Sequence, residues 1–261
     1  MIKDARPESK DHAEAAFDLI IRGFARLERG VHPVVEGVAG PARFLRWPER
    51  GRRGQEFSEE FFALDQDPAA VLAAVRETRP GPDHLIAEVS VRNQPAQEAY
   101  FAAGYEFGSQ EPLMVADLTE ANSLPDPSLT CSRVATMGEV DQILAAQQSA
   151  GYPQRLFSQA LLDDPGISIR AAFRDGGFAA IGKLAIVESG VYITDVMTMP
   201  EQRRQGFGAT VMRGLHTDAR AAGAERSVLT STAMARSLYE RLGYRQIGLV
   251  TLYATPERAT G

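Results

Sequence analysis

Cysteine and histidine are scarce in this 261-residue sequence, which contains one cysteine and four histidines. The single thiol, Cys131, excludes an internal disulfide framework and suits a reducing compartment. The histidines lie too far apart along the chain for the spacing of a metal site, at His12, His32, His84 and His216. We therefore expect no metal and a cytoplasmic location.

Long apolar runs and an excess of positive charge are also missing. The segment from Met1 to Glu8 is charged and has no apolar core of a signal peptide, and no stretch approaches the roughly 18 apolar residues that span a bilayer. The net charge of −6 argues against binding to a phosphate backbone. Arg50, Arg52 and Arg53 are interpreted as a solvated surface run. We expect neither a membrane nor a nucleic acid as partner.

Size and composition indicate two domains. Hydrophobic residues make up 44% of the chain and charged residues 24%, as in ordinary globular proteins, and 261 residues suffice for two domains of common size. Residues 119–128 are polar and carry two prolines, which is typical of a linker. The predicted division is therefore a domain over 1–118, a linker over 119–129 and a domain over 130–261.

The second domain alternates helical and strand-like patterns. Apolar periodicity and glycine turns predict strands at 131–136, 167–173, 178–187, 191–198, 227–230 and 244–253, and helices at 138–150, at 158–162 and from Phe207 onward. A further helix, closed by Gly243, is predicted from Met234, Leu238 and Leu242, which form its expected core stripe, with Tyr239 on a neighbouring face. The order βαα-βββ-αβαβ predicts a layered α/β domain.

A weaker version of this pattern occurs in the first domain. Residues 85–91 resemble a strand and 94–103 a helix, and a further strand continues to Leu118. An offset of 139 residues aligns four pairs of residues: Ala96 with Ala235, Tyr100 with Tyr239, Gly104 with Gly243 and Tyr105 with Tyr244. We interpret this correspondence as an internal repeat.

Gly206 and Gly208 lie where a strand ends and a helix begins. The first amides of a helix have no intrahelical partner and lie at the positive end of its dipole, so such a junction can bind an anion. The glycines allow close approach of a ligand, and Arg203 and Arg204 supply positive charge. Taken alone, a G-x-G after a strand is more often an ordinary turn.

Two segments resemble signatures of the GNAT acetyltransferase superfamily. Met197 to Gly208, which contains Arg203-Arg204-Gln205-Gly206-Phe207-Gly208, is similar to the R/Q-x-x-G-x-G/A signature, including the proline six residues before the first glycine. Ala235 to Tyr244 is similar to the second signature, A-x-x-L-Y-x-x-L-G-F/Y. The resemblance covers about half of the chain, with both signatures in the expected order.

The resemblance implies two GNAT-like layered domains, each a mixed, mostly antiparallel sheet flanked by helices. In the second domain, two parallel strands at 191–198 and 227–230 would splay apart to admit acetyl-CoA as co-substrate. The backbone of Val196, Met197 and Thr198 would face the pantetheine, and one N–H could polarise the thioester carbonyl. The pyrophosphate would bind the loop formed by Arg203, Arg204, Gln205, Gly206, Phe207, Gly208 and Ala209.

By the same resemblance, Tyr239 donates a proton or a hydrogen bond to the departing coenzyme A thiolate, and Ala235 leaves room for the cofactor. A core-edge tyrosine with a satisfied hydroxyl is the alternative. Thr232 stands where the family often has asparagine, and its hydroxyl can cap the helix. Ser227 occupies the position of a carboxylate base, so Asp195 is the nearest candidate base, with an ordinary surface role as the alternative.

The first domain fits the second signature at Glu88, Asn93, Ala96 and Tyr100 but has no matching pyrophosphate loop. The nearest candidate, at 48–54, is followed by Glu56, whose charge would repel a diphosphate. We expect a degenerate domain without cofactor that serves as a lid, a substrate wall or a dimer surface. A homodimer is therefore one of the expected possibilities.

The combined prediction is an N-acetyltransferase. A small-molecule or peptide amine would attack the thioester of acetyl-CoA directly in a ternary complex. The alternative is a non-catalytic, regulatory module that binds acyl-CoA, which the missing asparagine and the missing base at position 227 favour. The sequence does not identify the acceptor amine.

Overall fold

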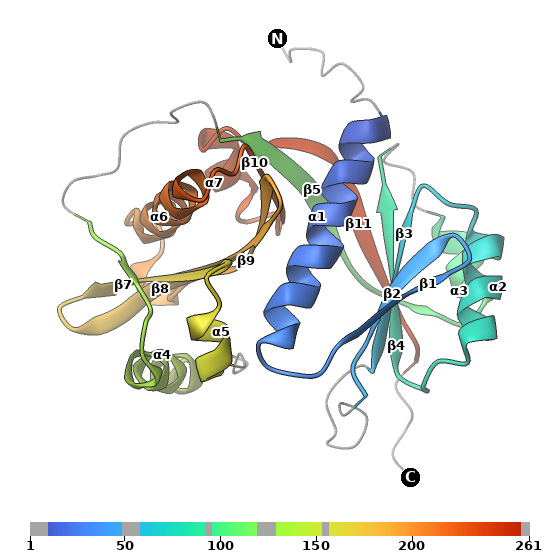
Figure 1. Ribbon diagram of the computed structural model, residues 1–261, viewed down its shortest axis with the longest axis horizontal. Helices are drawn as coiled ribbons and strands as arrows, with labels where there is room; N and C mark the ends of the chain where they lie inside the picture. Colours follow the sequence, from blue (N-terminus) through green and yellow to red (C-terminus); the bar gives the residue numbers. More distant parts are fainter. Residues whose placement is uncertain (1–9, 49–57, 92–95, 119–128, 153–156, 257–261) are drawn as a thin grey trace.

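The structure is a computed structural model that describes residues 10–48, 58–91, 96–118, 129–152 and 157–256. Its strands form one 11-stranded mixed sheet in the order β1-β2-β3-β4-β11-β5-β10-β9-β8-β7-β6. Figure 1 shows helices on both faces of this sheet. The predicted α/β class is therefore confirmed.

The second half follows the predicted order of elements. These elements are β6 (Ser132–Arg133), α4 (Met137–Ser149), α5 (Gln159–Asp163), β7 (Ile167–Arg174), β8 (Gly177–Val187), β9 (Gly190–Thr198), the 3-10 turn η2 (Pro200–Gln202), α6 (Phe207–Ala221), β10 (Arg226–Thr230), α7 (Arg236–Arg241) and β11 (Arg245–Ala254). The main difference is β6, because only two residues of the predicted strand at 131–136 pair with β7.

Local sequence explains where two of these helices begin or end. The Thr136 side chain accepts a hydrogen bond from the Glu139 amide, and Glu139 accepts one from the Thr136 amide, which forms a capping box before α4. Gly223 adopts a left-handed φ of 79° after α6, and the Ala224 amide donates to the Ala219 carbonyl at 2.9 Å.

The first half contains more regular structure than the sequence patterns indicated. Only β4 (His84–Ser90), α3 (Gln97–Ala102) and β5 (Glu106–Asp117) correspond to predicted elements. The others are α1 (Lys10–Arg29), β1 (Val35–Ala39), β2 (Ala42–Arg46), β3 (Glu59–Leu64) and α2 (Pro68–Thr78). The proposed linker segment 119–128 lies outside the described residues.

Strands of the two halves alternate in the middle of the sheet. β11, from the second half, lies between β4 and β5, and β5, from the first half, lies between β11 and β10. All of these contacts are antiparallel, and each strand satisfies its neighbours' backbone groups. The two sheets expected from the sequence are thus joined into one, because their terminal strands pair instead of leaving exposed edges.

Helix α1 covers strands of both halves on one face of the sheet. It packs against β3, β8, β9 and β10, and Figure 1 shows it in the middle of the molecule. Residues of α1, α4 and α5 join one core cluster on this face. On the opposite face, α6 and α7 cover the strands of the second half, while α2 and α3 cover those of the first.

Local geometry repeats at the predicted offset of 139 residues. The N-cap residues of α3 and α7 are Ala96 and Ala235, and the glycines that follow, Gly104 and Gly243, have φ of 89° and 88°. β5 and β11 then begin at Glu106 and Arg245, the same offset apart. The helix-turn-strand unit is therefore built twice.

Candidate active site

The parallel strands β9 and β10 separate partway along their length. They pair only from Gly190 with Arg226 to Tyr192 with Val228. β9 stays paired with β8 as far as Thr198, and β10 stays paired with β5 as far as Thr230. The two strands therefore splay apart as predicted, and each turns backbone groups without strand partners toward the opening between them.

A β-bulge in β9 accounts for the separation. The register between β8 and β9 shifts after Thr194, so that β9 has one residue more than β8 before Met197 pairs with Ile181. Asp195, at the bulge, has a left-handed φ of 53°. A bulge bends its strand and increases its twist, which directs the end of β9 away from β10. No local sequence pattern indicated this bulge.

The residues of β9 after the bulge direct their side chains to the two faces of the sheet. Val196 packs toward the helix α6 side of the sheet and Met197 toward the opposite side. Val196, Met197 and Thr198 are all half-buried. Their side chains are thus used for packing on the two faces, while the main chain borders the opening.

The N-terminus of α6 lies at the end of β9 and has no side-chain cap. Gly206 is the N-cap residue with φ of 90°, and Phe207, only 2% exposed, anchors the first turn in the core. A Cβ atom at Gly208 would lie 3.1 Å from Thr198 Oγ1 and 3.4 Å from Leu238 Cδ2. Gly206 is therefore favoured by its left-handed backbone and Gly208 by close packing against two side chains. The first amides of α6 remain available to an anion.

The side chains of the preceding loop are exposed, and one of them reaches the segment that follows α4. Arg203 donates a hydrogen bond to the Tyr152 hydroxyl at 2.6 Å and another to the Thr198 carbonyl at 3.3 Å. Arg204 has φ of 61° and is exposed, as is Gln205. Two exposed arginines thus lie shortly before the uncapped helix in the chain, and Ala209, in the first turn of α6, is half-buried.

Tyr239 lies on α7 with its ring in the core. It is 4% exposed and packs against Tyr244, with the ring centroids 5.7 Å apart. Burial and then the negative charge of Glu111 raise its pKa to about 12. Within the described part of the chain, no hydrogen bond uses the Tyr239 hydroxyl. It is therefore a protonated hydroxyl that is free to donate.

Two predictions about the start of α7 are wrong. Met234 is 72% exposed, whereas Tyr239 and Leu242 are buried. The N-cap is Ala235 without a side-chain hydrogen bond, and Thr232 contributes its carbonyl, which accepts from the Ala235 amide at 3.1 Å. Because α7 begins only at Arg236, helical spacing does not extend back to Met234.

Ser227 belongs to a buried hydrogen-bond network. The Tyr244 hydroxyl lies 2.6 Å from Ser227 Oγ and 2.8 Å from His216 Nε2. All three residues are at most 3% exposed. Burial lowers the pKa of His216 from 6.5 to about 4, so its imidazole is neutral at pH 7.

The lowered pKa of His216 leads us to expect a loss of folding stability at low pH. The unfolded chain takes up a proton on His216 below pH 6.5, whereas the folded chain does not do so until about pH 4. Stability should therefore fall as the pH decreases through this window, by up to roughly 3 kcal/mol from this group. In urea unfolding at pH 7 and pH 4.5, His216→Gln should lose clearly less stability than the wild type. Equal losses would contradict the assignment.

Asp195 and Glu111 are the carboxylates placed near the opening. Asp195 Oδ2 lies 3.1 Å from Nζ of Lys183, a residue of β8 whose ammonium also lies 4.2 Å from the Phe157 ring centroid. Glu111 lies on β5, which belongs to the first half of the chain. Sequence reasoning missed Glu111 and Lys183, because nothing in the linear sequence shows that β5 lies next to β10.

The corresponding strand pair of the first half stays closed. β3 and β4 pair in parallel along all of β3, and beyond it the Val91 amide donates to the Asp65 carboxylate at 3.1 Å. The following helix, α2, is capped by Asp67, which accepts from the Ala69 amide. The helix junction therefore lies at 65–68, away from the candidate segment 48–54, most of which lies outside the described residues.

The residues that fit the second signature in the first half are used for packing. Glu88 accepts hydrogen bonds from the Ala96 amide and the Tyr253 hydroxyl at 3.0–3.1 Å. Tyr100 is fully buried and stacks on Tyr253, with the ring centroids 4.3 Å apart. Its hydroxyl has no hydrogen-bond partner within the described residues. Asn93 lies outside the described residues.

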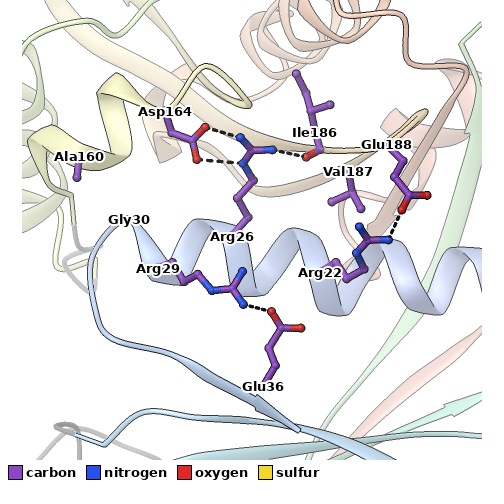
Figure 2. Close-up of a pocket in the computed structure, with 10 residues that line it drawn as sticks. All are labelled: Arg22, Arg26, Arg29, Gly30, Glu36, Ala160, Asp164, Ile186, Val187 and Glu188. Atoms are coloured by element: carbon purple, nitrogen blue, oxygen red, sulfur yellow. Dashed lines mark hydrogen bonds and ion pairs between the residues drawn. The ribbon is translucent and has the colours of Figure 1, made fainter. Parts of the chain in front are cut away.

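A cavity of about 510 Å³ lies at the other end of β9 from the splayed strands. Figure 2 shows that Arg22, Arg26 and Arg29, on one side of α1, line it and that each faces a carboxylate. Arg26 binds both oxygens of Asp164, at 2.5 and 3.0 Å. The charges of these arginines are already compensated: Arg22 and Arg26 connect α1 to the second half, and Arg29 connects it to β1 of the first half. They are therefore distinct from the candidate active site.

The described residues contain no group of three or more histidine, cysteine or acidic side chains that could hold a metal ion.

None of the helices within the described ranges combines the length and the apolar character needed to cross a membrane.

Part of the chain matches the model of a known family. Residues 137–244 match the model of the acetyltransferase (GNAT) family. A search of curated proteins gave no match.

Solved structures share the fold over most of the chain. A GCN5-related N-acetyltransferase from Kribbella flavida is 22% identical and has a TM-score of 0.69, covering 95% of this chain and 96% of that chain. A functionally unknown conserved protein from Staphylococcus epidermidis is 11% identical, with a TM-score of 0.59 and coverage of 87% and 95%. A GCN5-related N-acetyltransferase from Sphaerobacter thermophilus is 12% identical, with a TM-score of 0.54 and coverage of 84% and 82%.

Proposed function

Because residues 137–244 match the model of the GNAT acetyltransferase family, we propose that this protein transfers the acetyl group of acetyl-CoA to a primary amine. The amine attacks the thioester carbonyl directly within a ternary complex. The observation that carries the proposal is the uncapped N-terminus of α6 at the end of the splayed pair β9 and β10.

The residues at this junction fit a diphosphate. The first amides of α6 and the exposed guanidinium groups of Arg203 and Arg204 provide hydrogen-bond donors and positive charge. In the proposed complex the loop from Arg203 to Ala209 holds the pyrophosphate, while the main chain of Val196–Thr198 borders the pantetheine. Ala235, at the start of α7, leaves space beside the cofactor, and Thr232 precedes it by three residues.

Tyr239 acts on the leaving sulfur in this proposal. Its pKa of about 12 lies well above the value of about 8.5 for an ordinary thiol. Complete proton transfer from the tyrosine to the thiolate would therefore be uphill by roughly 5 kcal/mol. Donation of a hydrogen bond, which stabilises the negative charge that develops on sulfur, fits this hydroxyl better.

Asp195 contributes negative charge beside the acceptor amine. Its carboxylate is held beside the opening by an ion pair with Lys183. We therefore propose that Asp195 attracts the ammonium group of the acceptor. The first half of the chain takes no cofactor in this proposal and forms one wall of the acceptor site.

The experiment is an acceptor screen with the purified full-length chain. Acetyl-CoA is offered with amino acids, polyamines, aminoglycosides and peptides with free N-termini, and released thiol is measured. We expect thiol release that depends on one class of amine and product amide in equal amounts by mass spectrometry. Tight binding of acetyl-CoA by calorimetry without turnover on any amine would instead favour a non-catalytic, acyl-CoA-binding module.

A further inference from the structure

Glu111 lies at the open end of the splayed strands, although it belongs to the first half of the chain. The last pair between β5 and β10 is Leu113 with Thr230, and Glu111 lies two residues beyond it on β5. On its other side Glu111 pairs with Val250 of β11. Its side chain is half-buried.

The side chain of Glu111 points to the face of the sheet opposite α6 and α7. Leu113 and Val115 lie in the core cluster shared with α1, α4 and α5. Side chains alternate along a strand, and the irregularities in the pairing of β5 with β11 fall between Gln246 and Gly248 and after Leu252, not between Glu111 and Leu113. Glu111 therefore shares its face with Tyr192, the last β9 residue that pairs with β10.

The charge of Glu111 acts on both sides of the opening. It contributes to raising the pKa of Tyr239 on α7 and that of Tyr192 on β9, in each case after burial. Within the described residues, neither an ion pair nor a hydrogen bond engages its carboxylate. A half-buried carboxylate without a counter-ion lowers the free energy of unfolding, and binding of a cation would offset this cost.

We propose that Glu111 binds the ammonium group of the acceptor amine and accepts its proton, so that the first half of the chain completes the active site of the second. This inference rests on the proposed acetyl transfer. It assigns a catalytic role to a residue outside the segment that matches the family, and it implies a cationic amine as acceptor.

The resulting step balances in protons and electrons. One proton of the ammonium group moves to the Glu111 carboxylate, and the nitrogen lone pair forms a bond to the thioester carbonyl carbon. The carbon–sulfur bond then breaks with its electron pair on sulfur, while Tyr239 donates a hydrogen bond to the sulfur. The second nitrogen proton passes through water to the thiolate. The products are the amide, the thiol and one proton on Glu111.

Two further carboxylates give the same face a negative potential. Asp195 on β9 and Glu60 on β3 also raise the pKa of Tyr192 through their charge. Lys183 is paired with Asp195 and so offsets part of this charge. A cationic acceptor would be attracted by this potential, whereas an anionic one would be repelled.

The test compares Glu111→Gln with the wild type on two nucleophiles. With a primary alkylamine, which is an ammonium ion at pH 7, the variant should lose about a hundredfold in kcat/KM. With hydroxylamine, which is largely uncharged at pH 7, the loss should shrink to less than about tenfold, because no proton has to be removed before attack. Calorimetry should show unchanged affinity for coenzyme A.

Two variants control the interpretation. Glu106→Gln removes a charge from the exposed, opposite end of β5, where Glu106 pairs with Ala254, and should behave as the wild type. Glu111→Asp retains a carboxylate and should recover part of the alkylamine activity. If Glu111→Gln is as active as the wild type, or is equally impaired with both nucleophiles, the inference is wrong. A wild type that is inactive with every amine overturns the proposed function as well.

Discussion

Replacement of Gly206 by glutamate is expected to abolish binding of acetyl-CoA. A carboxylate at this N-cap would accept hydrogen bonds from the first amides of α6 and occupy the anion site itself. It would also repel the diphosphate: two unit charges about 4 Å apart near a protein surface cost roughly 4 kcal/mol. We expect affinity for coenzyme A to fall at least about a hundredfold in calorimetry.

Gly206→Ala is the matched control for this change. Alanine introduces the same strain at φ of 90°, and its Cβ would lie 3.0 Å from Leu129 Cδ1, but it brings no charge. It should lower the free energy of unfolding by about 1–2 kcal/mol and reduce affinity far less than glutamate does. If Gly206→Glu is folded by circular dichroism and still binds coenzyme A normally, the diphosphate binds elsewhere and the proposed site is wrong.

Tyr239→Phe should slow the chemical step and leave cofactor binding intact. The ring remains in the core against Tyr244, and only the hydroxyl that stabilises the leaving sulfur is lost. Removal of one such hydrogen bond typically costs about a hundredfold in kcat or more. Turnover at saturating acetyl-CoA and amine, together with the dissociation constant of coenzyme A, measures the two effects separately.

Tyr100→Phe is a matched control within the same chain. Tyr100 occupies the equivalent position in α3, but its hydroxyl is buried without a hydrogen-bond partner among the described residues. Its removal should leave turnover unchanged and raise the free energy of unfolding by about 1 kcal/mol, since an unsatisfied buried hydroxyl is costly. Normal turnover in Tyr239→Phe would show that Tyr239 has only a packing role.

The second half could be predicted well from the sequence because its signals are local. Gly206 reflects a φ of 90°, and Gly208 reflects close packing against Thr198. Both requirements come from neighbouring segments of the chain. Val211, Leu215 and Ala219 are all fully buried on one side of α6, as their spacing indicated. Periodicity and turn residues thus locate these elements to within a few residues.

The first half was predicted less completely, although part of the signal was present. Apolar residues recur at helical spacing in α1, for example Ala13, Ala16 and Ile20, all of which are buried. The helix that follows β3 was missed because it is capped by Asp67 and begins with Pro68, without a glycine loop. The start of this helix is therefore marked by Asp67 and Pro68 and not by glycine.

The sequence by itself determined the family resemblance, the glycine junction at the start of α6 and the helix-turn-strand unit that occurs twice. The bulge at Asp195, the splaying of β9 from β10 and the position of Glu111 beside them were decided only by the tertiary structure. These features depend on which strands become neighbours in the sheet. That choice is made by pairing between segments more than 100 residues apart, such as Glu111 with Val250, and no local pattern in a linear sequence encodes it.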